Sequence, residues 1–297
     1  MARCPVALLY LVGKRENVRI PTLAVVLSMV ALGLGPKDLA AQNPLIERQY
    51  HPWGCFEPGT WKTVRVVTET LDEEGKVTST STTETKTTLV DVEENSVTLQ
   101  IEVKVEVAGK RFDSQPQVVK QGFHGELAHQ KVTVKRMEPG SVEIEGRAIP
   151  CDVFQLISDN TTGRTTTTIH FSKTVPPYVL KRETAVTDPD SKQVLSETSV
   201  EVEALQMPCK VLAEIQSTSL LVAHHKNAKG TTITLARNSP SIPGGIVRHC
   251  SKELDAEGRL VRRSILELVD YGTAAPEPQR TGLLRRLRSS RHRKVAE

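Results

Sequence analysis

One pattern of residues occurs twice in the second half of the chain and constrains its fold most strongly. Copy one begins at Ile149-Pro150-Cys151, passes through a Gly/Thr-rich hairpin to Val175-Pro176-Pro177, and ends in VLSETSVEVEAL. Copy two begins at Met207-Pro208-Cys209, continues through GTTITLARNS to Ile242-Pro243-Gly244, and ends in LVRRSILELVDYG. Such a repeat predicts two β-units of the same design in tandem.

The spacing between the copies changes along their length. The Pro-Cys pairs are 58 positions apart, whereas Asp188 and Asp255 are 67 apart. Insertions are tolerated best in turns. We therefore predict that copy two has a hairpin about nine residues longer, with His224-His225-Lys226 at its tip. The predicted units are 149–205 and 206–272, after an N-terminal β region at 42–148.

The local patterns favour strands throughout. Residues 97–107 alternate between aliphatic and polar side chains, as in a half-buried antiparallel strand. Thr and Val are abundant and no long stretch has a helical period. The alternating pattern is interrupted at Pro176-Pro177 and at Pro243-Gly244-Gly245. Because a central strand does not tolerate proline, we expect no central strand to pass through these positions. We predict a mainly β protein built from antiparallel sheets.

The first 41 residues read as a signal peptide. Lys14, Arg15 and Arg19 precede an apolar run at 21–35, and Ala40-Ala41 follows as a small-residue cleavage site. The prediction is export, to the periplasm or the extracellular space. An uncleaved anchor is the alternative, although the run is short for a membrane span.

Four cysteines remain after cleavage, in a compartment that permits disulfides: Cys55, Cys151, Cys209 and Cys250. Four cysteines allow three pairings. The position in copy one that matches Cys250 is Glu183, so Cys151 has no equivalent partner within its own copy. We predict Cys209–Cys250 and Cys55–Cys151. Cys151–Cys209 is the rival pairing.

Basic residues are concentrated in the C-terminal segment 273–297. Seven Arg or Lys and no acid lie between Arg280 and Lys294, beside three leucines. We expect a tail that is disordered when alone and that contacts an anionic membrane or an acidic polysaccharide. Nucleic acid is disfavoured, because aromatic residues are only 4% of the chain and provide few stacking platforms.

Catalytic signatures are missing from the sequence. It contains no G-x-S-x-G, P-loop or G-x-G-x-x-G pattern, so we predict no catalytic residue and no cofactor. His124 and His129 are five positions apart, whereas a zinc-protease helix needs four. Candidate metal ligands are His224, His225 and His249, if the long hairpin brings them together.

Two further groups of residues are candidates for roles on the sheet. Glu201 and Glu267 are equivalent acids on the polar faces of strands and are weak candidates for general acid/base work. Trp53 and Trp61 flank Cys55. We predict that their segment plugs an open end of the core, with a ligand-stacking wall as the alternative.

The stretch EPGSVEIEGRAIPCDVFQLISDNTTGRTTTTIHFSKTVPPYVLKRE, residues 138–183, resembles a segment of uncharacterised exported bacterial β-proteins. The ending LELVDYG of copy two fits the same pattern. More distantly, residues 138–272 are similar to the half-barrel of outer-membrane lipoprotein carriers (LolA-like). The resemblance implies a concave antiparallel sheet, curved as a half-barrel, that covers an apolar ligand. It transfers no catalytic residue.

Two functions remain open from the sequence. The first is an exported, non-enzymatic envelope protein that binds an apolar ligand or lipid, or that acts as a structural or interaction module. The alternative is a metal-dependent or carboxylate hydrolase acting on envelope polymers, which rests on the three histidines and on export.

Overall fold

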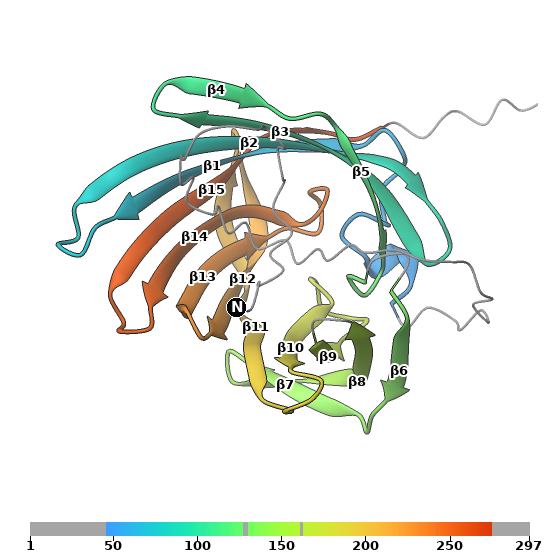
Figure 1. Ribbon diagram of the computed structural model, residues 1–297. Coiled ribbons are helices and arrows are strands. Elements are labelled where there is room, and N and C mark those ends of the chain that lie inside the picture. The colour runs from blue at the N-terminus through green and yellow to red at the C-terminus, as the bar shows by residue number, and fades with distance from the viewer. Residues whose placement is uncertain (1–45, 127–129, 161–162, 275–297) are drawn as a thin grey trace, which may run out of the picture.

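The computed structural model describes residues 46–126, 130–160 and 163–274. The predicted signal peptide at 1–41 and residues 275–297 of the predicted tail lie outside this range. The described chain contains one 3-10 turn, η1, and fifteen strands (Figure 1). Their bounds are η1 Arg48–Tyr50, β1 Trp61–Leu71, β2 Val77–Val92, β3 Ser96–Val107, β4 Lys110–Asp113, β5 Gln117–Gly122, β6 Val132–Arg136, β7 Gly140–Ile144, β8 Arg147–Asn160, β9 Gly163–Phe171, β10 Val179–Thr187, β11 Val194–Val211, β12 Glu214–Asn227, β13 Gly230–Asn238, β14 Ile246–Asp255 and β15 Leu260–Gly272.

The strands form one antiparallel sheet in the order β4-β3-β2-β1-β15-β14-β13-β12-β11-β10-β9-β8-β6. Strand β5 also pairs with β3, and β7 also pairs with β8. Figure 1 shows the sheet curving strongly, so that the β2–β5 end lies above the β6–β10 end. The predicted mainly β, antiparallel, half-barrel architecture is confirmed. Both predicted units belong to this one sheet: position 149 lies within β8 and position 206 within β11.

The two copies match at a spacing of 67 residues through their first hairpin. Strands β8 and β12 begin and end 67 residues apart, and so do β9 and β13. The predicted longer hairpin is therefore wrong, because the two hairpins are equal in length. His224 and His225 lie within β12, before the turn. The counterpart of Cys151 is Thr218 and not Cys209. A Pro-Cys pair occurs in both copies, but at positions that are not equivalent in the structure. The spacing of 58 between these pairs is therefore not the spacing of the copies.

A third copy of one hairpin lies at the N-terminal side. Residues 71–77, LDEEGKV, match residues 254–260, LDAEGRL. The hairpins β1–β2, β10–β11 and β14–β15 turn at Asp72, Asp188 and Asp255. Each aspartate donates its backbone N–H across the turn, at 3.0, 2.8 and 2.9 Å, and its carboxylate accepts backbone N–H groups of the turn. This is the turn chemistry that aspartate favours.

The N-terminal segment 46–60 fills the space between the two ends of the sheet. Ile46 and Trp53 are buried in the main apolar cluster, as the prediction of a plug requires. Trp61 instead lies half-buried on β1. The other members come from both sheet ends: Leu89, Val97, Leu99 and Phe123 from one, and Phe154, Leu156, Ile169 and Phe171 from the other. Two smaller clusters surround Leu180 and Ile242.

None of the four described cysteines is paired. Cys209 lies on β11 and Cys250 on β14, with β12 and β13 between them. Three strand spacings amount to roughly 14 Å, about twice the Cα separation that a disulfide spans. The predicted Cys209–Cys250 bridge is therefore wrong. Cys55, Cys151 and Cys209 are each free in this structure, so the predicted Cys55–Cys151 bridge is not formed, and neither is the rival Cys151–Cys209.

Candidate functional site: the concave face of the sheet

The inner face of the sheet is lined by three parallel rows of side chains that cross β11 to β2. Residues opposite each other on antiparallel strands point to the same face, so the strand register defines each row. The apolar row is Val202, Leu221, Ala236, His249, Leu266 and Val66. The hydroxyl row is Thr234, Ser251, Ser264, Thr68 and Ser81 on β13 to β2, and it continues on β12 and β11 as the apolar residues Ala223 and Val200. The rim row is Thr198, His225, Thr232, Glu253, Arg262 and Thr70.

The apolar row is the one deepest in the concavity. Val202, Ala236, Leu266 and Val66 are all buried. His249 is the one ionisable side chain in this row, between Ala236 and Leu266. Burial lowers the pKa of His249, because desolvation disfavours the imidazolium. The row therefore presents a neutral imidazole among aliphatic groups.

The hydroxyl row separates the apolar row from the rim. Thr234 and Ser251 share a hydrogen bond at 2.9 Å between their hydroxyl oxygens. Ser251 also donates to the carbonyl of Ile233 at 3.3 Å. Small hydroxyls bonded to each other and to the backbone give a polar surface without charge.

The rim row carries the charge. Arg262 Nη1 donates to Glu253 Oε2 at 3.0 Å, with both side chains at most one third exposed. Two strands away, His225 Nδ1 lies 2.8 Å from Thr198 Oγ1, and its Nε2 lies 3.1 Å from Asn227 Nδ2. Burial lowers the pKa of His225, and the charge of Glu253 opposes that shift. Polarity therefore increases from the apolar row outward to the rim.

Strand β3 continues the apolar lining on the opposite wall. Four aliphatic residues of β3 pair with inner-face residues of β2 and therefore extend the rows across β2. The pairs are Ile101 with Thr87, Val103 with Thr85, Val105 with Thr83, and Val107 with Ser81. Phe112 of β4 pairs with Val105 and is 52% exposed. Within the described part of the chain, no core cluster includes these four aliphatic residues. The strand that the sequence identified most clearly thus presents an apolar face to the concavity.

The predicted metal ligands do not converge. His225 and His249 share the inner face, but β13 lies between them and they occupy different rows. His224 points to the outer face, since neighbouring residues of a strand alternate. Across residues 46–126, 130–160 and 163–274, no three His, Cys, Asp or Glu side chains are grouped to hold a metal ion.

Glu201 and Glu267 lie on the outer face, each in an ion pair across its own hairpin. Lys181 is 3.9 Å from Glu201, and Arg248 is 3.6 Å from Glu267. The third copy has the same pair between Arg65 and Glu84, at 2.6 Å. The acids are thus a repeated feature of the hairpin, on separate hairpins and away from the concavity.

A buried polar cluster joins the N-terminal segment to the wall of the concavity. Arg182 of β10 donates to the backbone carbonyl of His124, and His124 Nδ1 is 3.4 Å from Glu126. His51 Nδ1 accepts hydrogen bonds from the backbone N–H groups of Trp53 and Gly54, and its ring stacks on Phe123. The pKa of His51 is lowered to about 4, chiefly by burial; the charge of Glu126 opposes this shift, and His124 and Arg182 add to it.

Sequence reasoning missed this cluster and the third hairpin for different reasons. The cluster joins Arg182 to a loop 58 positions away, a contact that no local pattern encodes. The hairpin was visible, since LDEEGKV and LDAEGRL differ at three of seven positions. A search for repeats across the whole chain would have found it.

The fold defines an open, curved, antiparallel β protein with an amphipathic inner face. No helix among the described residues has the length and apolarity needed to cross a membrane. No protein-family model matches the chain, and no curated protein matches it.

Solved structures give low-identity likenesses. One is a "putative exported protein with YmcC-like fold" from Bacteroides fragilis, 13% identical, with a TM-score of 0.30 over 72% of this chain and 97% of that one. Another is a "putative lipoprotein" from Parabacteroides distasonis, 11% identical, with a TM-score of 0.32 over 75% of this chain and 98% of that one. The resemblance to lipoprotein carriers stays a prediction.

Proposed function

We propose that the chain is an exported, non-enzymatic envelope protein whose concave face binds an amphipathic lipid. The observation that carries the proposal is the inner face of β3. Its four aliphatic side chains, Ile101, Val103, Val105 and Val107, face the concavity and belong to no core cluster among the described residues. Burying apolar surface contributes roughly 25 cal/mol per Å², so an acyl chain along this strand would gain several kcal/mol.

The graded rows give the lipid an orientation. Its acyl part lies along the inner face of β3, where the aliphatic side chains are only partly buried. Its polar head lies at the rim, where Arg262, Glu253 and His225 offer one cation, one anion and a titratable ring. A head group with hydrogen-bonding oxygens suits this rim, because hydroxyls line the approach to it.

The test compares the two faces of one strand. Val105 points into the concavity and Glu106, the next residue, points out. We expect Val105→Asp to weaken the binding of a fluorescent fatty acid at least ten-fold, while Glu106→Ala leaves it unchanged. Native mass spectrometry of the protein from its own host should also show a co-purified lipid on the wild type.

Equal binding by wild type and Val105→Asp, or no binding by either, would contradict the proposal. Thermal melting of both variants controls for folding. The hydrolase alternative gains no support from the positions of His224, His225 and His249. Metal analysis of the purified protein separates the two functions, since the hydrolase requires a stoichiometric transition metal.

The basic tail would hold the protein at an anionic surface. The last described residue, Ala274, donates its backbone N–H to the hydroxyl of Thr60 at 3.1 Å, so a chain cut after it keeps this contact. We expect the cut protein to lose retention on vesicles containing phosphatidylglycerol, but to keep its affinity for the fluorescent fatty acid. Undiminished retention would show that the tail is not the anchor.

A further inference from the structure

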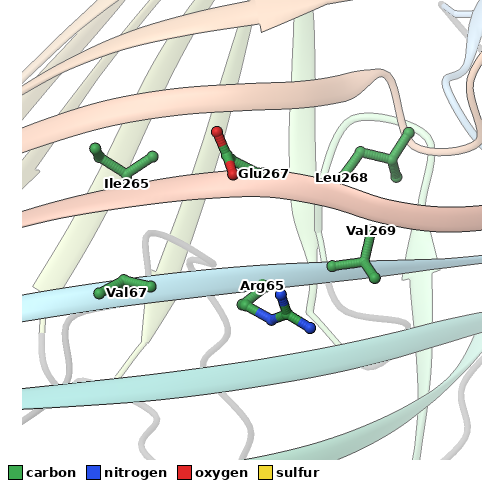
Figure 2. Close-up of a pocket in the computed structure, with 6 residues that line it drawn as sticks. All are labelled: Arg65, Val67, Ile265, Glu267, Leu268 and Val269. Atoms are coloured by element: carbon green, nitrogen blue, oxygen red, sulfur yellow. The ribbon is translucent and has the colours of Figure 1, made fainter. Parts of the chain in front are cut away.

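The outer face carries an exposed apolar pair on the neighbouring strands β15 and β1. Ile265 of β15 and Val67 of β1 lie opposite each other and are 44% and 40% exposed. Figure 2 shows them with Arg65, Glu267 and Val269 around a shallow hollow of about 290 Å³ between the two strands. Exposed apolar groups surrounded by charge have the layout of a protein interface.

The charges around this pair follow a strict order. On β15, Ile265 lies between Arg263 and Glu267, two residues to either side. On β1, Val67 lies between Arg65 and Glu69. Because the strands are antiparallel, Glu267 pairs with Arg65 and Arg263 pairs with Glu69. We call these six residues the β15–β1 strip.

We propose that the β15–β1 strip binds the same strip of a second copy of this chain, about a two-fold axis that runs along the line from Val67 to Ile265. The rotation places Glu267 opposite Arg263 of the second copy, and Arg65 opposite Glu69 of the second copy. Ile265 and Val67 meet their own counterparts. One rotation therefore gives four ion pairs around an apolar centre.

The order of the charges points to a second copy rather than to an unrelated partner. On each strand a cation and an anion lie on opposite sides of the apolar residue, so a half-turn about the line from Val67 to Ile265 makes each strand complementary to its own copy. The charges are already engaged within the chain: Arg263 lies 2.5 Å from Glu69, and Arg65 lies 2.6 Å from Glu84. Each carboxylate of the strip therefore gains a second guanidinium without a large rearrangement.

The curvature of the sheet sets the size of the contact. Two convex faces touch along a few strands, here β15, β1 and their immediate neighbours (Figure 1). A strip about three strands wide and eight residues long measures roughly 14 by 27 Å. Such an area is at the low end for specific interfaces, so the dimer is weak and depends on concentration. At the edge of the contact, Arg248 of one copy would face Lys252 of the other, both on β14. The repulsion between these like charges also limits the affinity of the dimer.

The test is sedimentation velocity of the full chain from its own host over a roughly hundred-fold range of concentration. We expect a monomer–dimer equilibrium that Ile265→Asp weakens at least ten-fold. Val194→Asp is the matched control, because Val194 is 48% exposed on β11, away from the strip. Glu267→Arg should weaken the dimer similarly, and Glu267→Arg combined with Arg263→Glu should restore it.

The charge exchange distinguishes this contact from nonspecific association. A monomer at every concentration would overturn the proposal. So would a dimer that survives both Ile265→Asp and Glu267→Arg, or a double variant that stays as weak as Glu267→Arg. Thermal melting establishes that each variant is folded. Glu201→Arg, the equivalent charge reversal on β11 and away from the strip, controls for a general effect of reversing a charge on the outer face.

Discussion

Individual buried residues explain why the N-terminal segment keeps its place. His51 supplies an acceptor to two backbone N–H groups of its own turn, at 3.3 and 3.0 Å, and only the neutral ring can do so. Arg182, beside it, is a cation that further disfavours protonation. A neutral histidine is therefore built into the joint between this segment and the sheet.

The first prediction concerns pH. The pKa of His51 falls from 6.5 to about 4 on folding, so the unfolded chain binds more protons between these values. Stability contributed by His51 is fully present above pH 6.5 and is lost as the pH falls toward 4, by up to about 3 kcal/mol. Urea unfolding at pH 4.5 and pH 7 should show this loss. His51→Asn should flatten the profile, whereas His224→Asn, on the exposed outer face, should not.

At the scale of elements, a single strand was more predictable from the sequence than the pairing between distant strands. The alternation of residues 97–107 predicted β3 and its inward face from sequence alone, because a period of two is a local property. The pairing of β1 with β15 joins residues that are 192 to 211 positions apart in the sequence. Nothing in the local sequence specifies that pairing, and the three rows of the concave face depend on it. The site therefore became visible only with the sheet order.

Gly163 and Gly230 begin equivalent strands of the two copies, so substituting each of them tests whether the two copies pack equally tightly. A Cβ on Gly230 would lie 1.9 Å from the carbonyl oxygen of Leu254, and one on Gly163 would lie 2.7 Å from that of Thr187. A Cβ on Gly258, in the Asp255 turn, would meet nothing, although its φ of +81° is also left-handed. Gly258→Ala should cost about 1–2 kcal/mol. Gly230→Ala and Gly163→Ala should each lower the free energy of unfolding by more than this, because the backbone of the neighbouring strand must move to make room for the methyl group.

Chemical denaturation of the three variants measures this difference. Equal costs for Gly230→Ala and Gly258→Ala would mean that the β13–β14 contact yields easily to a methyl group. A large cost for Gly230→Ala with none for Gly163→Ala would show that the two copies, although matched in register, differ in how tightly their hairpins pack.

At the scale of the whole molecule, one long sheet is held curved by a short segment that is not part of it. The main cluster takes residues from β2 and β3 at one end and from β8 and β9 at the other, with Ile46 and Trp53 between them. The pairing order leaves β4 and β6 at the ends of the sheet, so no strand ladder joins them. Composition and strand patterns predicted a mainly β chain, whereas closure by the N-terminal segment required the tertiary contacts.

The final prediction follows from that closure. Trp53→Ala removes the largest side chain of the segment from a cluster where it is 8% exposed, and should cost about 3–5 kcal/mol. Trp61→Ala, on β1 and half-buried, is the matched control and should cost less. Hydrogen exchange should accelerate together in β3 and β8, which supply the two walls of the cluster that holds Trp53, and change least in β12, which contributes nothing to that cluster. Uniform acceleration across all strands would instead mean that the sheet unfolds as one unit and that the segment stabilises it globally.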